Sequence, residues 1–352
     1  MAALTPPLIG VVEGFYGRAW DPIERNGAAK WFAALGLNTY LYAPKSQRYL
    51  RSRWRDPFPE VELSVLGEMA SAYRGAGLRW GLGLSPLGVN QGLGSPDLRA
   101  LRSKVAQIAA LKPDILALLF DDMSHSNELT APRQLECLTV VQEVLPDTEL
   151  IVCPTYYSSD PVLEEVFGPI PTGYIDYYQR HLDPRVAVFW TGPKVCSSTI
   201  GQSDIEVAKQ QWGERLVLWD NYPVNDGRVR SQHLYLKPLA ARTGGTLLHG
   251  HLCNPMNQLH LSTLGLSGLS ALYQQRSNEQ IERQLAEILG SDFRAWAAEH
   301  AERFETVRLD DLGHRERDAL VSTLRQFKGA AARECMAWLA GEYRFDPACL
   351  TE

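Results

Sequence analysis

Short apolar and β-branched runs alternate with longer helical stretches from Leu8 to about Gln275. Each run is followed by room for a helix, a pattern that predicts parallel strands joined by helical crossovers. The eight candidate strands are Leu8–Val12, Asn38–Tyr42, Arg79–Leu84, Ile115–Phe120, Leu150–Cys153, Val186–Trp190, Leu216–Trp219 and Thr246–His249. Together they predict an α/β fold, the (β/α)8 TIM barrel. An open doubly wound sheet is the alternative, but the GxGxxG signature usual after its first strand is missing.

The helix expected after the first strand has recognisable ends. Asp21 can cap it, Pro22 stands at its first position, and Glu24 lies three residues after the cap. Gly36 is expected to end this helix.

The pattern changes after Gln275. Ser277 and Gln280 predict a capping box, and amphipathic helices are expected over roughly 291–308 and 316–340. We therefore expect a (β/α)8 catalytic domain over residues 1–275 and a helical C-terminal region over residues 276–352. This region either packs on the barrel or offers a surface to a partner.

Composition and charge narrow the class of protein. Hydrophobic residues make up 45% and charged residues 22%, as in ordinary globular proteins. A net charge of −6 gives no sign of the basic surface that binding to nucleic acid or to an anionic membrane requires. The six cysteines lack metal-ligand spacing, so reduced thiols are expected. The N-terminus lacks a basic, apolar leader pattern and no long apolar stretch follows, so we expect a cytoplasmic protein.

Polar residues gather directly after the candidate strands. In a (β/α)8 barrel the carboxyl ends of all strands lie on one face, where the active site is built, so these residues would surround one pocket. They are Glu13-Gly14, Pro44-Lys45, Ser85-Pro86, Asp121-Asp122, Pro154 to Tyr157, Thr191-Gly192, Asp220-Asn221 and Asn254.

The adjacent acids Asp121 and Asp122 follow the apolar run ILALLF. Crowded like charges disfavour ionisation of both, which prepares a neutral acid beside a carboxylate, as glycoside hydrolysis requires. Adjacent residues do not easily flank a sugar from opposite faces, so a mechanism with the substrate's 2-acetamido group as nucleophile fits better than two-carboxylate geometries. The alternatives are a helix N-cap with a solvated acid, and a metal site that includes His125 with loose DDxxH spacing.

The segment 219–226 (WDNYPVND) sets an indole beside amides and carboxylates, which suits a sugar site. A buried aromatic before an ordinary turn is the alternative. Tyr157, in CPTYY, could donate to a substrate oxygen or simply pack. Lys45 could reach a hydroxyl or lie in solvent, and Gly14 could admit a sugar or form an ordinary turn.

Seven segments resemble the family 84 glycoside hydrolases, which comprise the O-GlcNAcases and related bacterial β-N-acetylglucosaminidases. They are VVEGFYGRAW (11–20), LNTYLYAPK (37–45), LLFDD (118–122), CPTYY (153–157), WTGPKV (190–195), WDNYPVND (219–226) and CNP (253–255). The resemblance covers about residues 8–275. It implies a retaining exo-β-N-acetylglucosaminidase that hydrolyses terminal β-linked N-acetylglucosamine, on a glycoprotein, glycopeptide or oligosaccharide, through an oxazoline. It implies no metal and no organic cofactor.

The resemblance also implies a role for each matching residue. Asp121 would orient and polarise the acetamido group, and Asp122 would be the general acid and then the base. Tyr157 would hydrogen-bond the acetamido oxygen. The remaining substrate contacts would come from Trp219 and Asn221 around the acetamide and ring, and from Lys45, the Gly14 backbone, Asp226 and Asn254 at the hydroxyls.

The sequence departs from the family pattern away from the two aspartates. Ser46-Gln47 stand where the family usually has acids, and Tyr156 stands where it commonly has Glu. SPLGV (85–89) replaces a common SPG run, and no acid follows the Asp pair two residues on. These departures concern the side of the leaving group. A non-catalytic sugar-binding or scaffold protein on the same barrel is the alternative function, and a chelator-sensitive metal hydrolase is a third.

Overall fold

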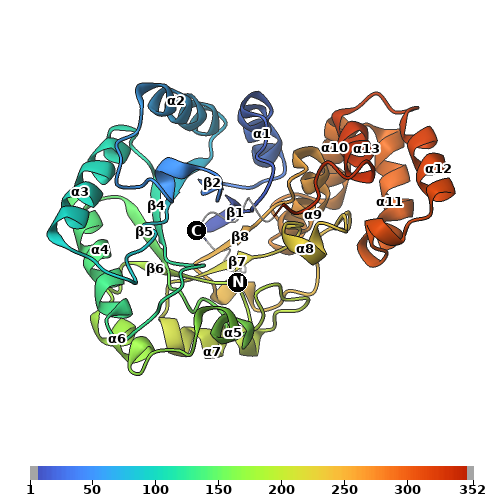
Figure 1. Cartoon of the computed structure of the whole chain (residues 1–352). Helices are drawn as coiled ribbons and strands as arrows, with labels where there is room; N and C mark the ends of the chain where they lie inside the picture. The colour runs from blue at the N-terminus through green and yellow to red at the C-terminus, as the bar shows by residue number, and fades with distance from the viewer. Residues whose placement is uncertain (1–6, 347–352) are drawn as a thin grey trace.

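The strands of the computed structural model, which describes residues 7–346, form a closed parallel barrel in sequence order (Figure 1). Each strand pairs with its sequence neighbours, and β1 closes the barrel against β8, with Leu8 opposite Gly250. The strands are β1 Leu8–Glu13, β2 Thr39–Tyr42, β3 Arg79–Leu84, β4 Ile115–Leu119, β5 Glu149–Cys153, β6 Ala187–Trp190, β7 Leu216–Asp220 and β8 Gly250–Cys253. The predicted (β/α)8 fold is therefore confirmed.

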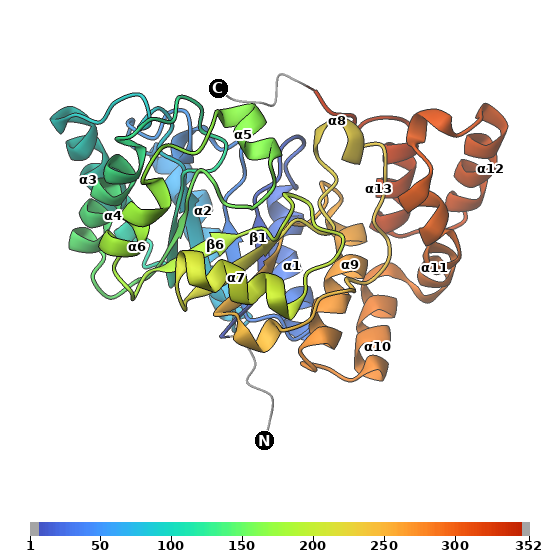
Figure 2. The same cartoon turned by 90° about the horizontal axis from the view of Figure 1, so that it is seen from below.

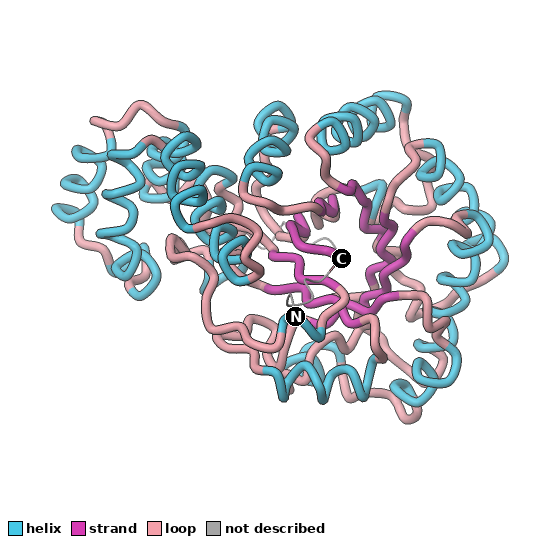
Figure 3. Tube along the Cα trace, turned by 180° about the vertical axis from the view of Figure 1, so that it is seen from behind, coloured by secondary structure: helices cyan, strands magenta, loops and turns pink. Residues whose placement is uncertain are grey.

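A layer of helices surrounds the strands, as Figure 3 shows from behind. The helices are α1 Pro22–Ala34, α2 Glu60–Gly75, α3 Ser95–Ala110, α4 Thr130–Val144, α5 Val162–Phe167, α6 Tyr174–His181, α7 Gln202–Trp212, α8 Gly227–Arg230 and α9 Leu259–Leu272, with 3-10 turns at Arg48–Leu50 and Gly245–Leu247. Helix α1 begins as predicted, because the Asp21 side chain accepts from the backbone N–H groups of Ile23 and Glu24 at 2.9 and 3.1 Å. Gly36, just after it, has a φ of +81°.

Seven predicted strands lie within one residue of the observed bounds, but the eighth was wrong. Residues 246–249 were predicted as a strand, and the chain instead forms a 3-10 turn at Gly245–Leu247 before β8 starts at Gly250. Glycine usually weakens a strand, so the sequence gives no signal there. The barrel requires it nonetheless, because a Cβ on Gly250 would lie 2.8 Å from the Cβ of Leu8 in β1.

The C-terminal helices lie together on one side of the barrel, next to α9 (Figures 1 and 2). They are α10 Asn278–Leu289, α11 Ser291–Thr306, α12 His314–Leu324 and α13 Ala330–Leu339. The predicted capping box at Ser277 and Gln280 is confirmed. The single helix expected over 316–340 is two helices: α13 begins anew after Gly329, and Phe327, between the two, packs against Phe293 and Trp296 of α11.

Two further expectations concern thiols and membranes. Cys137, Cys153, Cys196, Cys253 and Cys335 are free thiols, as expected, whereas Cys349 lies outside the described residues. Within residues 7–346 no helix is both long and apolar enough to cross a lipid bilayer.

A buried ion pair anchors α1 to the end of β1. The guanidinium of Arg25 donates to both carboxylate oxygens of Glu13, at 2.8 Å each, and the hydroxyl of Tyr40 also contacts Glu13. Glu13 is wholly buried, so its charge depends on this fork. Although it follows the first strand, as the predicted site residues do, its interactions serve the packing of the helix.

We expect Arg25→Met to lower the free energy of unfolding by about 3–5 kcal/mol, because it leaves the Glu13 carboxylate buried without its counter-charge. Urea unfolding followed by circular dichroism measures the change. Arg53→Met, which removes an exposed ion pair with Asp56, is the matched control and should change stability little. Equal unfolding midpoints for the two variants would contradict a stabilising role for the ion pair between Arg25 and Glu13.

Candidate active site

A pocket of about 180 Å³ opens at the carboxyl ends of the strands. It is lined by Gly14, Tyr16, Lys45, Asp121, Asp122, Cys153, Tyr157, Thr191, Val195, Cys196, Trp219, Asn221, Val224, Asp226 and Asn254. All nine residues predicted from the sequence as catalytic or substrate-binding are among them. The structure therefore brings them together, while their individual roles stay predictions.

A larger cavity, about 850 Å³, lies at the opposite end of the barrel, where the strands begin. Two arginines of its lining are paired with Glu149, which accepts from Arg79 at 2.5 Å, from Arg215 at 2.8 Å and also from His249 at 2.6 Å. Burial would raise the pKa of Glu149, but hydrogen bonds from His249 and Arg79 outweigh it and hold that pKa at about 2. We assign this end to stability, as is usual for the amino-terminal face of such barrels.

The two adjacent acids both line the pocket because the backbone turns sharply between them. Successive side chains of a strand point to opposite faces, so a continuing strand would separate them. Asp121 directly follows the extended residue Phe120, whose N–H donates to the carbonyl of Cys153 at 2.9 Å. Asp122 then adopts a φ of +57°, a left-handed conformation that aspartate tolerates better than most residues. This turn returns the second carboxylate to the pocket.

Lys45, from the loop after β2, balances the acid pair. Its ammonium contacts Oδ2 of Asp121 and lies 3.9 Å from Oδ2 of Asp122. It also lies 5.7 Å from the ring centroid of Trp219. Lys45 is 3% exposed, so the interpretation as a solvated lysine is wrong. The other oxygen of Asp121, Oδ1, is buried and has no hydrogen-bond partner within residues 7–346.

Two phenols hold the carboxylate of Asp122. The hydroxyl of Tyr16, from the loop after β1, donates to Oδ2 at 2.8 Å, and that of Tyr157, after β5, donates to Oδ1 at 3.1 Å. Burial and then the charge of Asp122 raise the pKa of both phenols well above the usual value of about 10. Both tyrosines therefore keep their protons and act as donors. The Asp122 side chain is 26% exposed, so a group that enters the pocket can contact this carboxylate.

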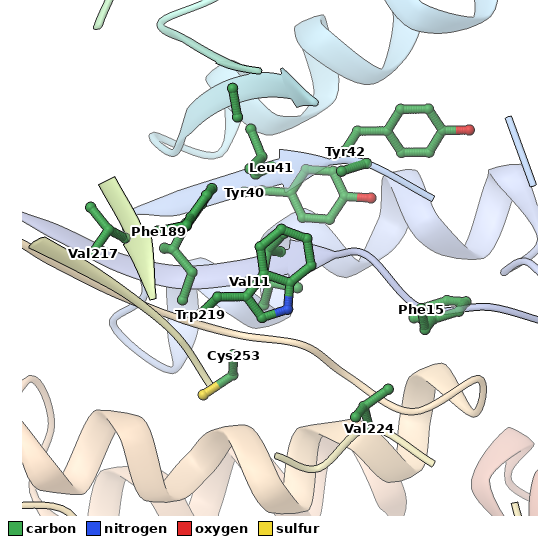
Figure 4. Close-up of a cluster of buried hydrophobic side chains, with 14 of the residues drawn as sticks. Val11, Phe15, Tyr40, Leu41, Tyr42, Phe189, Val217, Trp219, Val224 and Cys253 are labelled. Atoms are coloured by element: carbon green, nitrogen blue, oxygen red, sulfur yellow. The ribbon is translucent and has the colours of Figure 1, made fainter. Parts of the chain in front are cut away.

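One wall of the pocket is a hydrogen-bonded set of residues around an indole. Oδ1 of Asn221 accepts from Nε1 of Trp219 at 3.1 Å and from Nδ2 of Asn254 at 3.0 Å, and Oδ1 of Asn254 accepts from the N–H of Gly14 at 3.2 Å. A Cβ on Gly14 would lie 2.2 Å from Cζ2 of Trp219, so this glycine makes room for the indole. Figure 4 shows Trp219 among buried side chains, and Phe189 meets its ring edge-on at 5.1 Å.

Asp226 lines the pocket next to the loop that carries Tyr16. Its Oδ2 accepts from the backbone N–H of Tyr16 at 2.8 Å. Burial raises the pKa of Asp226 to about 6, although the Tyr16 N–H and Arg230 act in the opposite direction. This carboxyl therefore changes its charge in a pH range where enzymes work.

Asp220 follows the predicted seventh strand but faces away from the pocket. It accepts from Nε and Nη2 of Arg242 at 2.7 and 2.9 Å, and its Oδ2 lies 3.0 Å from Nε2 of His251. Within residues 7–346, Asp220, His251 and Cys253 are the one group of potential ligands with metal-like spacing. Because Arg242 occupies both oxygens of Asp220, this group fits an ion pair better than a metal. It does not include Asp121, Asp122 or His125.

The sequence interpretation did not single out several residues that line the pocket. Tyr16 stands in the motif VVEGFYGR, three residues after β1, and its phenol was the available signal. Val195 and Cys196 come from a loop that returns to the pocket, where the carbonyl of Val195 accepts from Nδ2 of Asn221 at 2.8 Å. No periodicity in the sequence marks such a return.

Comparison with known proteins adds a family to this geometry. Residues 9–306 match the family model described as NAGidase, beta-N-acetylglucosaminidase. Curated relatives are the Protein O-GlcNAcases of Rattus norvegicus and Mus musculus, each 30% identical over 283 residues. The match covers 77% of this chain, and it spans 30% of the length of those relatives.

Solved structures agree in fold. An O-GlcNAc hydrolase mutant of Thermobaculum terrenum superposes with a TM-score of 0.76 at 25% identity, covering 96% of this chain and 81% of that one. CpGH84B superposes with a TM-score of 0.76 at 22% identity, covering 95% of this chain and 66% of that one. Both similarities extend over the C-terminal helices as well as the barrel.

We expect Gly14→Ala to lower kcat/KM for 4-nitrophenyl N-acetyl-β-glucosaminide on the order of 100-fold, because the new methyl group displaces the indole of Trp219. Gly27→Ala is the matched control, since a Cβ there meets nothing within 4 Å. Thermal melts of both variants separate local displacement from unfolding. Unchanged kinetics in a folded Gly14→Ala variant would show that the indole position is irrelevant.

Proposed function

This chain belongs to the β-N-acetylglucosaminidase family, family 84 of the glycoside hydrolases, and we propose that it is a retaining exo-enzyme acting through an oxazoline. The observation that carries the proposal is the buried Oδ1 of Asp121, without a partner among the described residues, beside the partly exposed carboxylate of Asp122. A buried acceptor without a donor is costly in the free protein. It is ready to accept the N–H of a substrate acetamide.

The arrangement of the acids supports a nucleophile that belongs to the substrate. Lys45 contacts Asp121 and lies 3.9 Å from Asp122, so both carboxylates occupy the same side of the pocket. Retaining enzymes with a carboxylate nucleophile hold their two carboxyl groups on opposite sides of the scissile bond. A sugar facing this pair is attacked instead by its own acetamido oxygen.

In the proposed first step Asp121 accepts the acetamide N–H, which makes the acetamido oxygen a better nucleophile. That oxygen bonds to the anomeric carbon, the bond to the leaving oxygen breaks, and Asp122 gives its proton to the leaving oxygen. Water then adds to the anomeric carbon, Asp122 takes its proton, and the oxazoline opens. Two inversions at the same carbon retain the configuration.

Tyr157 connects substrate binding to the state of Asp122. Its hydroxyl donates to Oδ1 of Asp122 in the free protein, at 3.1 Å. In the proposed complex it donates to the acetamido oxygen instead, as that oxygen closes the oxazoline ring. Oδ1 of Asp122 thereby loses a donor and becomes free to carry the proton that the leaving group needs.

The size of the pocket supports a single terminal sugar as the substrate. Its volume of about 180 Å³ is small, and Tyr16 and Asp122 also line a neighbouring cavity of about 640 Å³ with room for the leaving group. The curated relatives are named for O-GlcNAc removal from proteins. We propose N-acetylglucosamine on a glycoprotein, glycopeptide or oligosaccharide end as the substrate.

We expect Asp122→Asn to lower kcat/KM for methyl N-acetyl-β-glucosaminide by about 10²–10⁴-fold, because this leaving group needs a proton. The loss for the 3,4-dinitrophenyl glycoside should be much smaller. Asp121→Asn should instead reduce hydrolysis of both substrates alike. Chelator should leave wild-type turnover unchanged. Equal losses for both leaving groups in Asp122→Asn would remove it from the acid role.

The pKa of Asp226, raised to about 6, predicts an acid limb in kcat/KM. Above that pH the carboxylate accepts strongly from sugar hydroxyls; as the pH falls through about 6, protonation removes the charge and binding weakens. We expect Asp226→Asn to lower kcat/KM by about 10–100-fold and to abolish this limb. The measurement is kcat/KM of the wild type and of Asp226→Asn at about ten pH values between about pH 4 and pH 8. An unchanged limb in the variant would exclude Asp226 as its origin.

A further inference from the structure

A buried arginine lies behind one oxygen of Asp122. Arg51, in the loop after β2, is 4% exposed, and its Nη2 donates to the hydroxyl of Tyr16 at 3.2 Å. Its guanidinium carbon lies 5.6 Å from the Tyr16 ring centroid. The same Tyr16 hydroxyl donates to Oδ2 of Asp122 at 2.8 Å. The three side chains thus form a relay that no step described above uses.

The chemistry of arginine fixes the direction of this relay. A guanidinium has only donors, so the Tyr16 oxygen must accept from Arg51. A phenol has a single proton, and that proton is then directed to Asp122. Burial and the charge of Asp122 raise the pKa of Tyr16, so the phenol keeps this proton, although Arg51 acts in the opposite direction. Oδ2 of Asp122 is therefore held as an acceptor.

The two oxygens of Asp122 consequently differ. Oδ2 lies 2.8 Å from the Tyr16 hydroxyl oxygen, which donates to it, and 3.9 Å from the Lys45 ammonium nitrogen, so a proton bound to Oδ2 would face both donors. Oδ1 faces Tyr157, a donor that the proposed mechanism transfers to the substrate. We propose that Arg51, acting through Tyr16, is a positioning residue that makes Oδ1 the atom of Asp122 that delivers the proton. This inference rests on the proposed function.

The burial of Arg51 carries a cost that this role explains. Its Nε and Nη1 atoms are buried and have no hydrogen-bond partner in the described part of the chain. A buried cation with unsatisfied donors is a poor source of stability. Arg51, Tyr16 and Asp122 all line the cavity of about 640 Å³ on the side of the leaving group. The cation is therefore set where the leaving oxygen receives its proton.

The test compares Tyr16→Phe, Arg51→Met and Arg51→Lys on two substrates, the methyl and the 3,4-dinitrophenyl N-acetyl-β-glucosaminides. A misplaced proton affects only the leaving group that needs it. We expect Tyr16→Phe and Arg51→Met to lower kcat for the methyl glycoside by about 10–100-fold, and kcat for the dinitrophenyl glycoside by less than about 3-fold, with little change in KM. Arg51→Lys retains a donor and should recover most of the loss.

Two comparisons make the result specific. Because Arg51 acts through Tyr16, the double variant should lose no more than Tyr16→Phe alone. Arg53→Met, an exposed arginine of the same loop, should leave both substrates unaffected. If Arg51→Met does not fold, Tyr16→Phe still tests the relay, because that substitution removes only one oxygen atom.

Equal losses on both substrates, additive losses in the double variant, or a folded Arg51→Met with wild-type kinetics would each overturn the inference. These outcomes are distinct from failure of the proposed function. That failure would appear as an inactive wild type, or as an Asp122→Asn variant that ignores the leaving group. If Asp122→Asn discriminates between leaving groups and the Arg51 and Tyr16 variants do not, only the relay is wrong.

Discussion

The site depends on one buried ion pair, between Lys45 and Asp121. Two carboxylates cannot share a small, poorly solvated pocket unless a cation offsets their repulsion. Lys45 supplies that cation from the loop after β2, while the acids follow β4. The parallel barrel makes the meeting possible, because it brings all the carboxyl ends of its strands to one face. The left-handed turn at Asp122 then returns the second acid to the ion pair.

Around the ion pair between Lys45 and Asp121, the other polar groups of the pocket are already held in place in the free protein. Tyr16 and Tyr157 hold the two oxygens of Asp122, and Asn221 and Asn254 hold each other and the Trp219 indole. Groups fixed in this way need little reorganisation during a reaction, which is the usual source of electrostatic catalysis. Oδ1 of Asp121 is the exception, since it is buried without a donor and so favours a ligand that supplies one.

Periodicity predicted the barrel because buried parallel strands are continuous apolar runs, and it failed at β8, which begins with a glycine that only tertiary packing requires. The acid pair was predictable because it follows such a run. Strand ends alone do not reveal which neighbouring side chain enters the pocket, so Glu13 and Asp220 were grouped with residues that do. Arg51 was missed because its position depends on a loop path that no pattern encodes.

Helix α9 has a consequence for how the chain can be divided. Every residue from Leu259 to Ser270 is buried, because α10 and α13 cover the side that the barrel leaves open. Glu334 of α13 accepts from the backbone N–H groups of His260 and Leu261, at 3.0 Å each, and so caps the start of α9. A chain cut after residue 275 would expose an apolar helix with an uncapped end. Evolution could therefore exchange the C-terminal helices only for another cover of the same shape.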